Sequence, residues 1–291
     1  AFIFSLRYHQ AYHAARLMAD RAILVPTVER EAAIGLGLFP PVLRGVRGIM
    51  YNSHEERALI HALSGNQDLP GVVVGVGSEI PSSVDPAGAR ARYGFERLVL
   101  ERAHPPDLVL IGAANMPIPD HPRVRHLGFV SDRDKFDVLA GAVALLMPSY
   151  YESLSMVAIE AWALGTPVVA NARCDVLVGQ CIRSQAGLYY TDAGEFLGIC
   201  DRLLTDPVLA GRLADNGRAY YTNEYSWPVI EQKYLEMLDT LSEQPVPRRM
   251  AGEPGWLSRR RRVLPPAADV VAALPTGPSL DSSLVAENGV A

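Results

Sequence analysis

The stretch PSYYESLSMVAIEAWALGTPVVAN, residues 148–171, decides how this chain folds. Its apolar middle predicts a helix over residues 153–164, closed by Gly165. ALLMPS at 144–149 predicts a strand before that helix, and PVVAN at 167–171 predicts a strand after it. A strand, a helix and a second strand in this order are typical of a βαβ unit with two parallel strands.

Segments on either side of this unit alternate in the same way. A helix is predicted over 54–64, opened by Ser53 as the N-cap, with Glu55 and Glu56 near the positive end of its dipole. Strands alternating with helices of this length predict an α/β fold with parallel sheets covered on both faces. The further strands are predicted within 21–27, 45–53, 107–112, 121–131 and 186–190, and the further helices over 132–142, 193–206, 207–224 and 228–242.

The composition excludes several classes of protein. Hydrophobic residues make up 49% of the 291 residues, which is enough for a sizeable core. The net charge of −5 does not favour binding of nucleic acid. The longest apolar run, 138–147, is half of the roughly 20 residues that span a bilayer. Cys174, Cys181 and Cys200 have neither disulfide nor metal-binding spacing and are interpreted as buried free thiols.

Glu152 and Glu160 are the candidate functional residues of the deciding stretch. Glutamate is common on helix surfaces, but ligands of open parallel sheets gather at the carboxyl ends of the strands, where the next helices begin. A helix start there offers free backbone N–H groups to a phosphate. Glu160, roughly 12 Å further along the helix axis than Glu152, suits the diol of a ribose. The free N–H groups would be those of Ser153, Leu154, Ser155 and Met156.

The full pattern from Pro148 to Ala170 is P-S-x-x-E-S-x-S-M-x-x-x-E-A-x-A-x-G-T-P-V-V-A. It resembles the signature of the retaining GT-B glycosyltransferases, the glycosyl transferases group 1 family. The segments DLVLIG, VRHLGFVSDRDKFDVLAGAVALLMPS and YSWPVIEQKYLEML resemble flanking elements of the same family. The resemblance is good from about 105 to 242 and weaker from 45 to 80. It implies two Rossmann-like domains that face a cleft, the C-terminal one for a nucleotide-activated sugar and the N-terminal one for the acceptor.

The resemblance also implies roles for the matched residues. Glu160 should bind the ribose of the donor, and Glu152, the candidate catalytic residue, should contact the hydroxyls of the transferred sugar. The N–H groups of Ser155 and Met156 should face the sugar and the diphosphate, next to Ser153 and Leu154. Ser155 and Met156 stand where the family usually has Gly-Leu, so the Ser155 side chain narrows the space in which the donor approaches.

Three further donor-binding residues lie outside this stretch. Phe129 and Val130 should lie near the base, and Gly112 ends the strand that precedes the nucleotide-side loop. The donor would be a UDP- or GDP-linked sugar. The resemblance implies no metal and no cofactor besides this substrate, because the helix dipole and basic side chains neutralise the diphosphate in this family.

The chain departs from the family pattern in two places. The first βαβ units of the acceptor domain are absent, and so is the strand with G-R and K-G that opens the donor domain and holds the diphosphate. Neither Lys135 nor Lys233 lies at a sequence position that could replace these residues, and Arg97 and Arg102 lie in a helical pattern. We therefore expect the chain as written to turn over a donor very slowly or not at all.

These observations predict an incomplete N-terminal Rossmann-like domain and a C-terminal one without its first strand. The start AFIFSLRYHQ has no Met and no basic region of a signal peptide, so we expect that the N-terminus is cut from a longer protein. The predicted parts are an acceptor-domain remnant at 1–77, a linker at 78–96, a donor domain at 97–224, a helix at 225–243 that crosses back to the N-terminal domain, and a disordered tail at 244–291.

Alternatives remain for the function and for the tail. The chain could be a non-catalytic nucleotide-sugar-binding or scaffold relative that has lost its diphosphate clamp, or a GT-B sugar-nucleotide epimerase. We expect a cytoplasmic protein. The basic run of the tail predicts either a solvated charge cluster or a weak contact with an anionic membrane surface. This run consists of Arg259, Arg260, Arg261 and Arg262.

Overall fold

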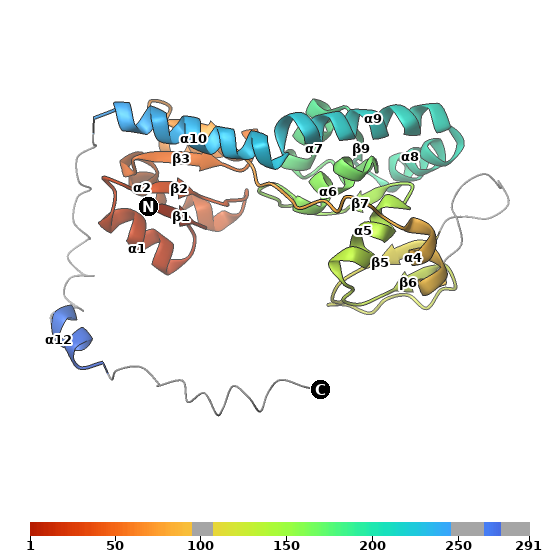
Figure 1. Cartoon of the computed structure of the whole chain (residues 1–291), viewed down its shortest axis with the longest axis horizontal. Coiled ribbons are helices and arrows are strands. Elements are labelled where there is room, and N and C mark those ends of the chain that lie inside the picture. The colour runs from red at the N-terminus through yellow and green to blue at the C-terminus, as the bar shows by residue number, and fades with distance from the viewer. Residues whose placement is uncertain (95–106, 246–264, 275–291) are drawn as a thin grey trace. The chain divides into compact units, whose positions relative to one another are not determined.

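A computed structural model of the chain describes residues 1–94, 107–245 and 265–274 (Figure 1). Residues 1–250 form one compact unit and residues 251–291 a second. Among the described residues, no helix combines the length and the apolar character needed to cross a membrane. Arg97, Arg102 and the basic run at 259–262 lie outside the described residues.

The N-terminal part of the first unit is a four-stranded parallel sheet in the order β1-β2-β3-β4. Its predicted helix begins and ends as the sequence indicates, because the Ser53 side chain accepts a hydrogen bond from Glu56 N–H and Gly65 ends the helix with φ +64°. The elements are β1 (Phe2–Phe4), α1 (His9–Leu17), β2 (Ile23–Val25), η1 (Ala32–Gly35), α2 (Phe39–Gly45), β3 (Gly48–Tyr51), α3 (His54–Ser64) and β4 (Gly71–Val73).

The following part contains a two-stranded sheet, β5-β6, and a three-stranded sheet, β7-β8-β9, and both are parallel. The prediction of an α/β fold with parallel sheets is therefore confirmed. The elements are α4 (Pro86–Tyr93), β5 (Leu108–Leu110), β6 (Val124–His126), α5 (Asp132–Ala140), β7 (Leu145–Met147), α6 (Met156–Leu164), β8 (Val168–Asn171), α7 (Asp175–Ser184), β9 (Gly187–Tyr190), α8 (Ala193–Thr205), α9 (Pro207–Glu224) and α10 (Trp227–Glu243).

Helix α6, which joins β7 to β8, lies at the centre of a hydrophobic core. Trp162 on this helix has no solvent-exposed surface, and its indole N–H donates to the carbonyl of Ala186 at 3.1 Å. Helix α9 packs on α6 at Gly217. A Cβ atom at Gly217 would come within 3.0 Å of the Trp162 ring, so glycine permits the close approach that fixes α6.

Helix α10 packs against β4 of the N-terminal sheet. Its residues Met237 and Leu241 belong to the same core cluster as Met50 and Val74. The Arg47 guanidinium also donates to the carbonyl of Gln244 at 3.0 Å, just after the end of the helix. The domain limits expected from the sequence remain a prediction, but the last long helix of the first unit contacts the sheet formed by the first residues.

Helices α4, α7 and α12 differ from the sequence-based expectation. The segment 78–96, expected to be a linker, contains α4, and α4 packs against α5. Helix α7 follows β8 and was not predicted. A short helix, α12 (Ala267–Ala272), lies within the segment expected to be a disordered tail. Cys174 and Cys181 are buried free thiols as expected, whereas Cys200 is partly exposed.

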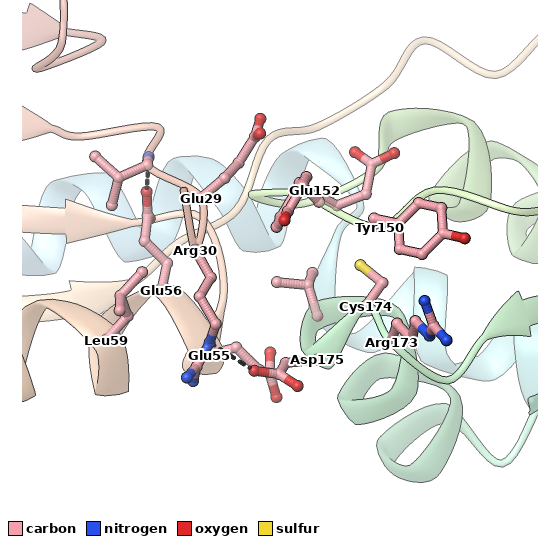
Figure 2. Close-up of a pocket in the computed structure, with 13 residues that line it drawn as sticks. Glu29, Arg30, Glu55, Glu56, Leu59, Tyr150, Glu152, Arg173, Cys174 and Asp175 are labelled. Atoms are coloured by element: carbon pink, nitrogen blue, oxygen red, sulfur yellow. Dashed lines mark hydrogen bonds and ion pairs between the residues drawn. The ribbon is translucent and has the colours of Figure 1, made fainter. Parts of the chain in front are cut away.

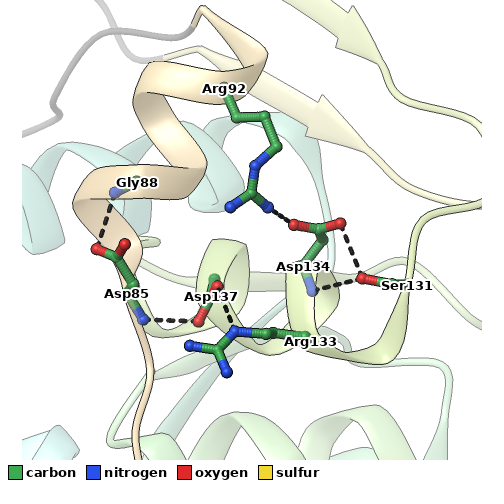
Figure 3. A network of polar contacts seen from close by, with 7 residues as sticks. All are labelled: Asp85, Gly88, Arg92, Ser131, Arg133, Asp134 and Asp137. Atoms are coloured by element: carbon green, nitrogen blue, oxygen red, sulfur yellow. Dashed lines mark hydrogen bonds and ion pairs between the residues drawn. The ribbon is translucent and has the colours of Figure 1, made fainter.

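A polar network fastens α4 to α5 (Figure 3). Asp85 caps α4 by accepting from Gly88 N–H at 2.9 Å. The Asp85 N–H in turn donates to the carboxylate of Asp137 at 2.6 Å, and Asp137 is only 1% exposed. Arg92 of α4 forms an ion pair with Asp134 of α5. Because the buried carboxylate of Asp137 receives this hydrogen bond, Asp137 is the residue on which this junction depends.

We expect Asp137→Ala to lower the free energy of unfolding by about 1–3 kcal/mol, since it leaves the Asp85 N–H without its acceptor. Asp137→Asn keeps an acceptor oxygen and should lose less. Urea unfolding followed by circular dichroism measures both, with Asp239→Ala at an exposed site of α10 as the control. A loss in Asp137→Ala no larger than that of the control would contradict this account of the junction.

Candidate functional site

The loop between β7 and α6 carries most of the predicted site residues. The helix begins at Met156 and not at Ser153 as predicted, because Ser155 has φ +70° and ψ 84° and so interrupts the helical backbone. The N–H groups without an intrahelical partner are therefore those of the first turn, which starts at Met156. Ser153 and Leu154 precede the helix, and the Leu154 side chain, only 4% exposed, packs into the core.

Ser155 is a buried residue in a conformation that favours glycine. It is 6% exposed, and among the described residues its hydroxyl has no hydrogen-bond partner. No side chain caps α6 at this position. The N-terminus of α6 is therefore uncapped at the carboxyl end of β7, where ligands of parallel sheets bind.

Glu160 lies slightly more than one turn into α6 and is 6% exposed. Its Oε1 accepts a hydrogen bond from Lys135 Nζ at 3.0 Å and another from the Ser78 hydroxyl at 3.1 Å. No sequence pattern places Lys135 beside Glu160, and its expected failure to replace the diphosphate-binding residues stays a prediction. Lys135 extends from α5 and neutralises a buried carboxylate that would otherwise be costly to keep charged.

Glu152 lies in the loop, four residues before α6, so the helical separation of the two glutamates that the sequence suggested does not apply. It is half-buried and lines a pocket together with Glu29, Tyr150 and Tyr151 (Figure 2). Burial raises the pKa of Glu152 above its ordinary value, a hydrogen bond with Ser149 opposes this shift, and the charge of Glu29 adds to it. Glu152 is thus a carboxyl group with raised proton affinity beside two exposed tyrosine rings.

Three other acidic groups of this pocket, Glu55, Glu56 and Asp175, already have partners. Glu55 accepts from both terminal nitrogens of Arg183 at 2.6 and 3.0 Å, and Arg30 contacts Asp175 at 3.0 Å. Glu56 accepts from two backbone N–H groups at 2.7 and 2.6 Å, and burial raises its pKa to about 8. These contacts fix the walls of the pocket.

Arg173 is a further cation of the pocket, and no sequence pattern indicates it. It follows β8, and its guanidinium carbon lies 5.6 Å from the centre of the Tyr150 ring. Within the described residues it forms no ion pair, whereas Arg30 does. The other lysine, Lys233, contacts Glu224 at 3.1 Å between α9 and α10.

The remaining predicted residues follow β5 and β6. Gly112 has φ +110°, and its N–H donates to the carbonyl of Gly128 at 2.7 Å. Phe129 is 85% exposed and Val130 is partly exposed. These residues follow the carboxyl ends of their strands, as Glu152 does after β7, so all four lie at the strand ends that the α/β fold uses for ligands.

Comparison with known proteins identifies the relatives of this chain. Residues 95–206 match the family model described as Glycosyl transferases group 1. The chain is 36% identical over 107 residues to an MMP alpha-(1->4)-mannosyltransferase of Mycolicibacterium hassiacum, covering 35% of this chain and 25% of that protein. It is 31% identical over 222 residues to a D-inositol 3-phosphate glycosyltransferase of Frankia alni, covering 60% of this chain and 54% of the relative. The chain thus spans from a quarter to about half of the length of these curated relatives.

Solved structures share the fold at low sequence identity. Sucrose-phosphate synthase from Thermosynechococcus elongatus aligns with a TM-score of 0.66 and 19% identity over 83% of this chain and 73% of that chain. HepE from Anabaena in complex with UDP aligns with a TM-score of 0.65 and 16% identity over 82% of this chain and 78% of that chain. These likenesses establish the GT-B fold.

Ser155→Gly should raise the free energy of unfolding, by up to about 1 kcal/mol, because it removes a side chain from the left-handed region. Ser155→Ala keeps the Cβ atom and should give no such gain. Ser83→Gly, at an exposed position without positive φ, controls for the flexibility that glycine adds to the unfolded chain. Thermal unfolding measures all three variants, and a loss of stability in Ser155→Gly as large as in Ser83→Gly would show that Ser155 is not strained.

Proposed function

We propose that this chain binds a nucleoside diphosphate sugar and transfers the sugar with retention of configuration. The proposal starts from two findings: residues 95–206 belong to the glycosyl transferases group 1, and the chain has the GT-B fold. One observation carries the proposal: a buried, charge-compensated glutamate lies slightly more than one turn into a helix whose N-terminus is uncapped at the end of a parallel strand. A ribose and a diphosphate together fit these two features.

In this proposal, Glu160 binds the ribose of the donor. Its Oε1 is occupied by Lys135 and Ser78, and among the described residues no hydrogen bond to Oε2 is present. Oε2 is therefore the oxygen that accepts from the two vicinal hydroxyls of a ribose. A carboxylate acceptor makes such bonds stronger than a neutral group would.

The diphosphate lies at the N-terminus of α6, against the N–H groups of the turn that begins at Met156. The positive end of the helix dipole is equivalent to only about half an elementary charge, whereas the departing diphosphate gains negative charge as the sugar bond breaks. Arg173 can add a full charge, because the pocket already holds it on Tyr150 and no carboxylate among the described residues neutralises it. Arg173 thus supplies part of the positive charge that the missing G-R and K-G segment would provide.

In the same proposal, Glu152, Tyr150 and Tyr151 bind the transferred sugar. The carboxyl group accepts from sugar hydroxyls, and the Tyr150 and Tyr151 rings, 52% and 57% exposed, offer apolar faces to a sugar ring. Because Glu29 lies on the other wall of the same pocket, a sugar bound there would contact residues from both halves of the first unit. No metal takes part in this proposal, and the acceptor is left open.

The solved neighbours support UDP as the first donor nucleotide to test, since HepE structures contain UDP and UDP-glucose. GDP is the second. A donor-only incubation separates the proposal from the epimerase alternative, because an epimerase needs no acceptor. We place the protein in the cytoplasm, and a membrane contact through the run at 259–262 stays part of the proposal.

Glu160→Gln should weaken binding of UDP or GDP by about 1–3 kcal/mol, since the ribose loses a charged acceptor. The amide retains an oxygen for Lys135 and Ser78, so thermal unfolding should change little. Isothermal titration calorimetry measures the affinity, with Glu236→Gln at an exposed site of α10 as the control. Equal affinity in Glu160→Gln and in the control would return Glu160 to a purely structural role.

Glu152→Ala should separate the sugar from the nucleotide. We expect the affinity for UDP to stay within about twofold, a difference well below 1 kcal/mol, while the affinity or turnover for the UDP-sugar falls. The reason is that Glu152 contacts only the sugar in the proposed arrangement. Titration with UDP and with UDP-glucose in parallel tests this, and an equal loss for both ligands would mean that the donor lies differently in the site.

A further inference from the structure

We propose that Lys135 is a nucleotide-positioning residue, which compensates the charge of Glu160 and turns its carboxylate so that Oε2 meets the ribose diol. This inference rests on the proposed function and assigns a residue that neither the family pattern nor the sequence position indicated. Lys135 comes from α5, 25 residues before Glu160 in the chain, and the fold alone brings the two together at 3.0 Å.

The contacts of the Glu160 carboxylate are asymmetric. Lys135 Nζ and the Ser78 hydroxyl both donate to Oε1, and no described residue donates to Oε2. Two donors on one oxygen fix the rotation of the carboxylate about its last bond. The second oxygen is then presented in a single direction before any ligand arrives, which lowers the entropy cost of binding.

The two groups that hold Oε1 are themselves fixed. The Lys135 ammonium lies 4.5 Å from the centre of the Phe136 ring and 3.7 Å from Asp132 Oδ1. Ser78 is held by the Tyr221 hydroxyl, which donates to the Ser78 carbonyl at 3.1 Å. Ser78 follows β4 and Lys135 belongs to α5, so two separate segments reach the carboxylate of α6, and Tyr221 of α9 holds one of them.

The positive charge of Lys135 explains why a neutral hydrogen-bond donor would not suffice at this position. Glu160 is 6% exposed, and a buried carboxylate without a counter-ion carries a large desolvation cost. Lys135 supplies that counter-ion, and its side chain is 29% exposed, so its ammonium keeps part of its hydration.

Two nucleotides, one with and one without the ribose diol, distinguish the positioning role of Lys135 from direct phosphate binding and from a purely structural role. If Lys135 acts through Glu160 and the diol, Lys135→Met should weaken binding of UDP roughly tenfold, which corresponds to about 1.4 kcal/mol. It should leave the affinity for 2′,3′-dideoxy-UDP unchanged, because that ligand has no diol. A lysine that contacted the phosphates directly would lose affinity for both nucleotides, and a lysine that only stabilised the fold would lower the unfolding temperature with no difference between the ligands.

The experiment is a calorimetric titration of the full chain with both nucleotides at pH 7. Lys135→Arg keeps the charge and should restore UDP binding to within about threefold of the wild type. Lys233→Met is the matched control, since Lys233 is the only other lysine in the sequence and pairs with Glu224 away from Glu160. Should Lys135→Met fold poorly, the pair Glu160→Gln and Lys135→Met/Glu160→Gln replaces it, and the added substitution should cost no further affinity.

The possible results test the role of Lys135 separately from the proposed function. Wild-type protein that binds neither UDP nor GDP overturns the proposed function and the inference together. Wild-type protein that binds UDP, with Lys135→Met equal to Lys233→Met, overturns only the inference. An equal loss for UDP and dideoxy-UDP in Lys135→Met also overturns it. If the wild type binds GDP more tightly than UDP, GDP and its dideoxy form are used in the same scheme.

Discussion

The buried carboxylate of Glu160 constrains the rest of the site. A charge at 6% exposure requires a partner, and the fold supplies Lys135 from α5 and Ser78 from the segment after β4. Each of these contacts fixes an element relative to α6. The position of α6 in turn depends on Trp162 and on the absence of a side chain at Gly217. The proposed binding geometry is therefore a consequence of core packing and charge compensation together.

The two ends of the proposed donor would bind in different surroundings. In the proposed arrangement, the nucleoside end would meet a carboxylate that is already oriented in the core, whereas the sugar end would meet the half-buried Glu152 in a loop and a pocket with walls fixed by ion pairs. Ser155 lies between them in a conformation that costs energy for any residue other than glycine. Affinity for the nucleotide and rate of transfer can accordingly change independently in variants of this site.

The sequence predicts the parts that depend on local rules. The start of α3 at Ser53 and its end at Gly65 follow from capping chemistry, and the strands around 144–149 and 167–171 follow from apolar runs between turns. Helix α4 is not expected from the sequence, although Asp85 followed by Pro86 is a start signal, because the Ser, Pro and Gly residues in and around it are typical of a linker. Helix α7 was missed because Cys174 gives no capping signal.

The parts that the sequence cannot supply are those set by tertiary structure. Whether Ser155 continues the helix depends on a backbone angle that the packing of Leu154 and the loop imposes. The pairing of Lys135 with Glu160, and the meeting of Arg173 with Tyr150, join residues that are far apart in the chain. The family pattern supplies the two glutamates, but the cations near them can be found only in three dimensions.

A crystal structure of the chain with bound UDP is the most direct test of the central claim, that Glu160 and the N-terminus of α6 form a nucleotide site. Our account predicts the ribose hydroxyls at hydrogen-bond distance from Glu160 Oε2, roughly 2.5–3.0 Å, with Lys135 still on Oε1 and the diphosphate against the first turn of α6. A nucleotide bound elsewhere, or a ribose without contact to Glu160, would contradict it.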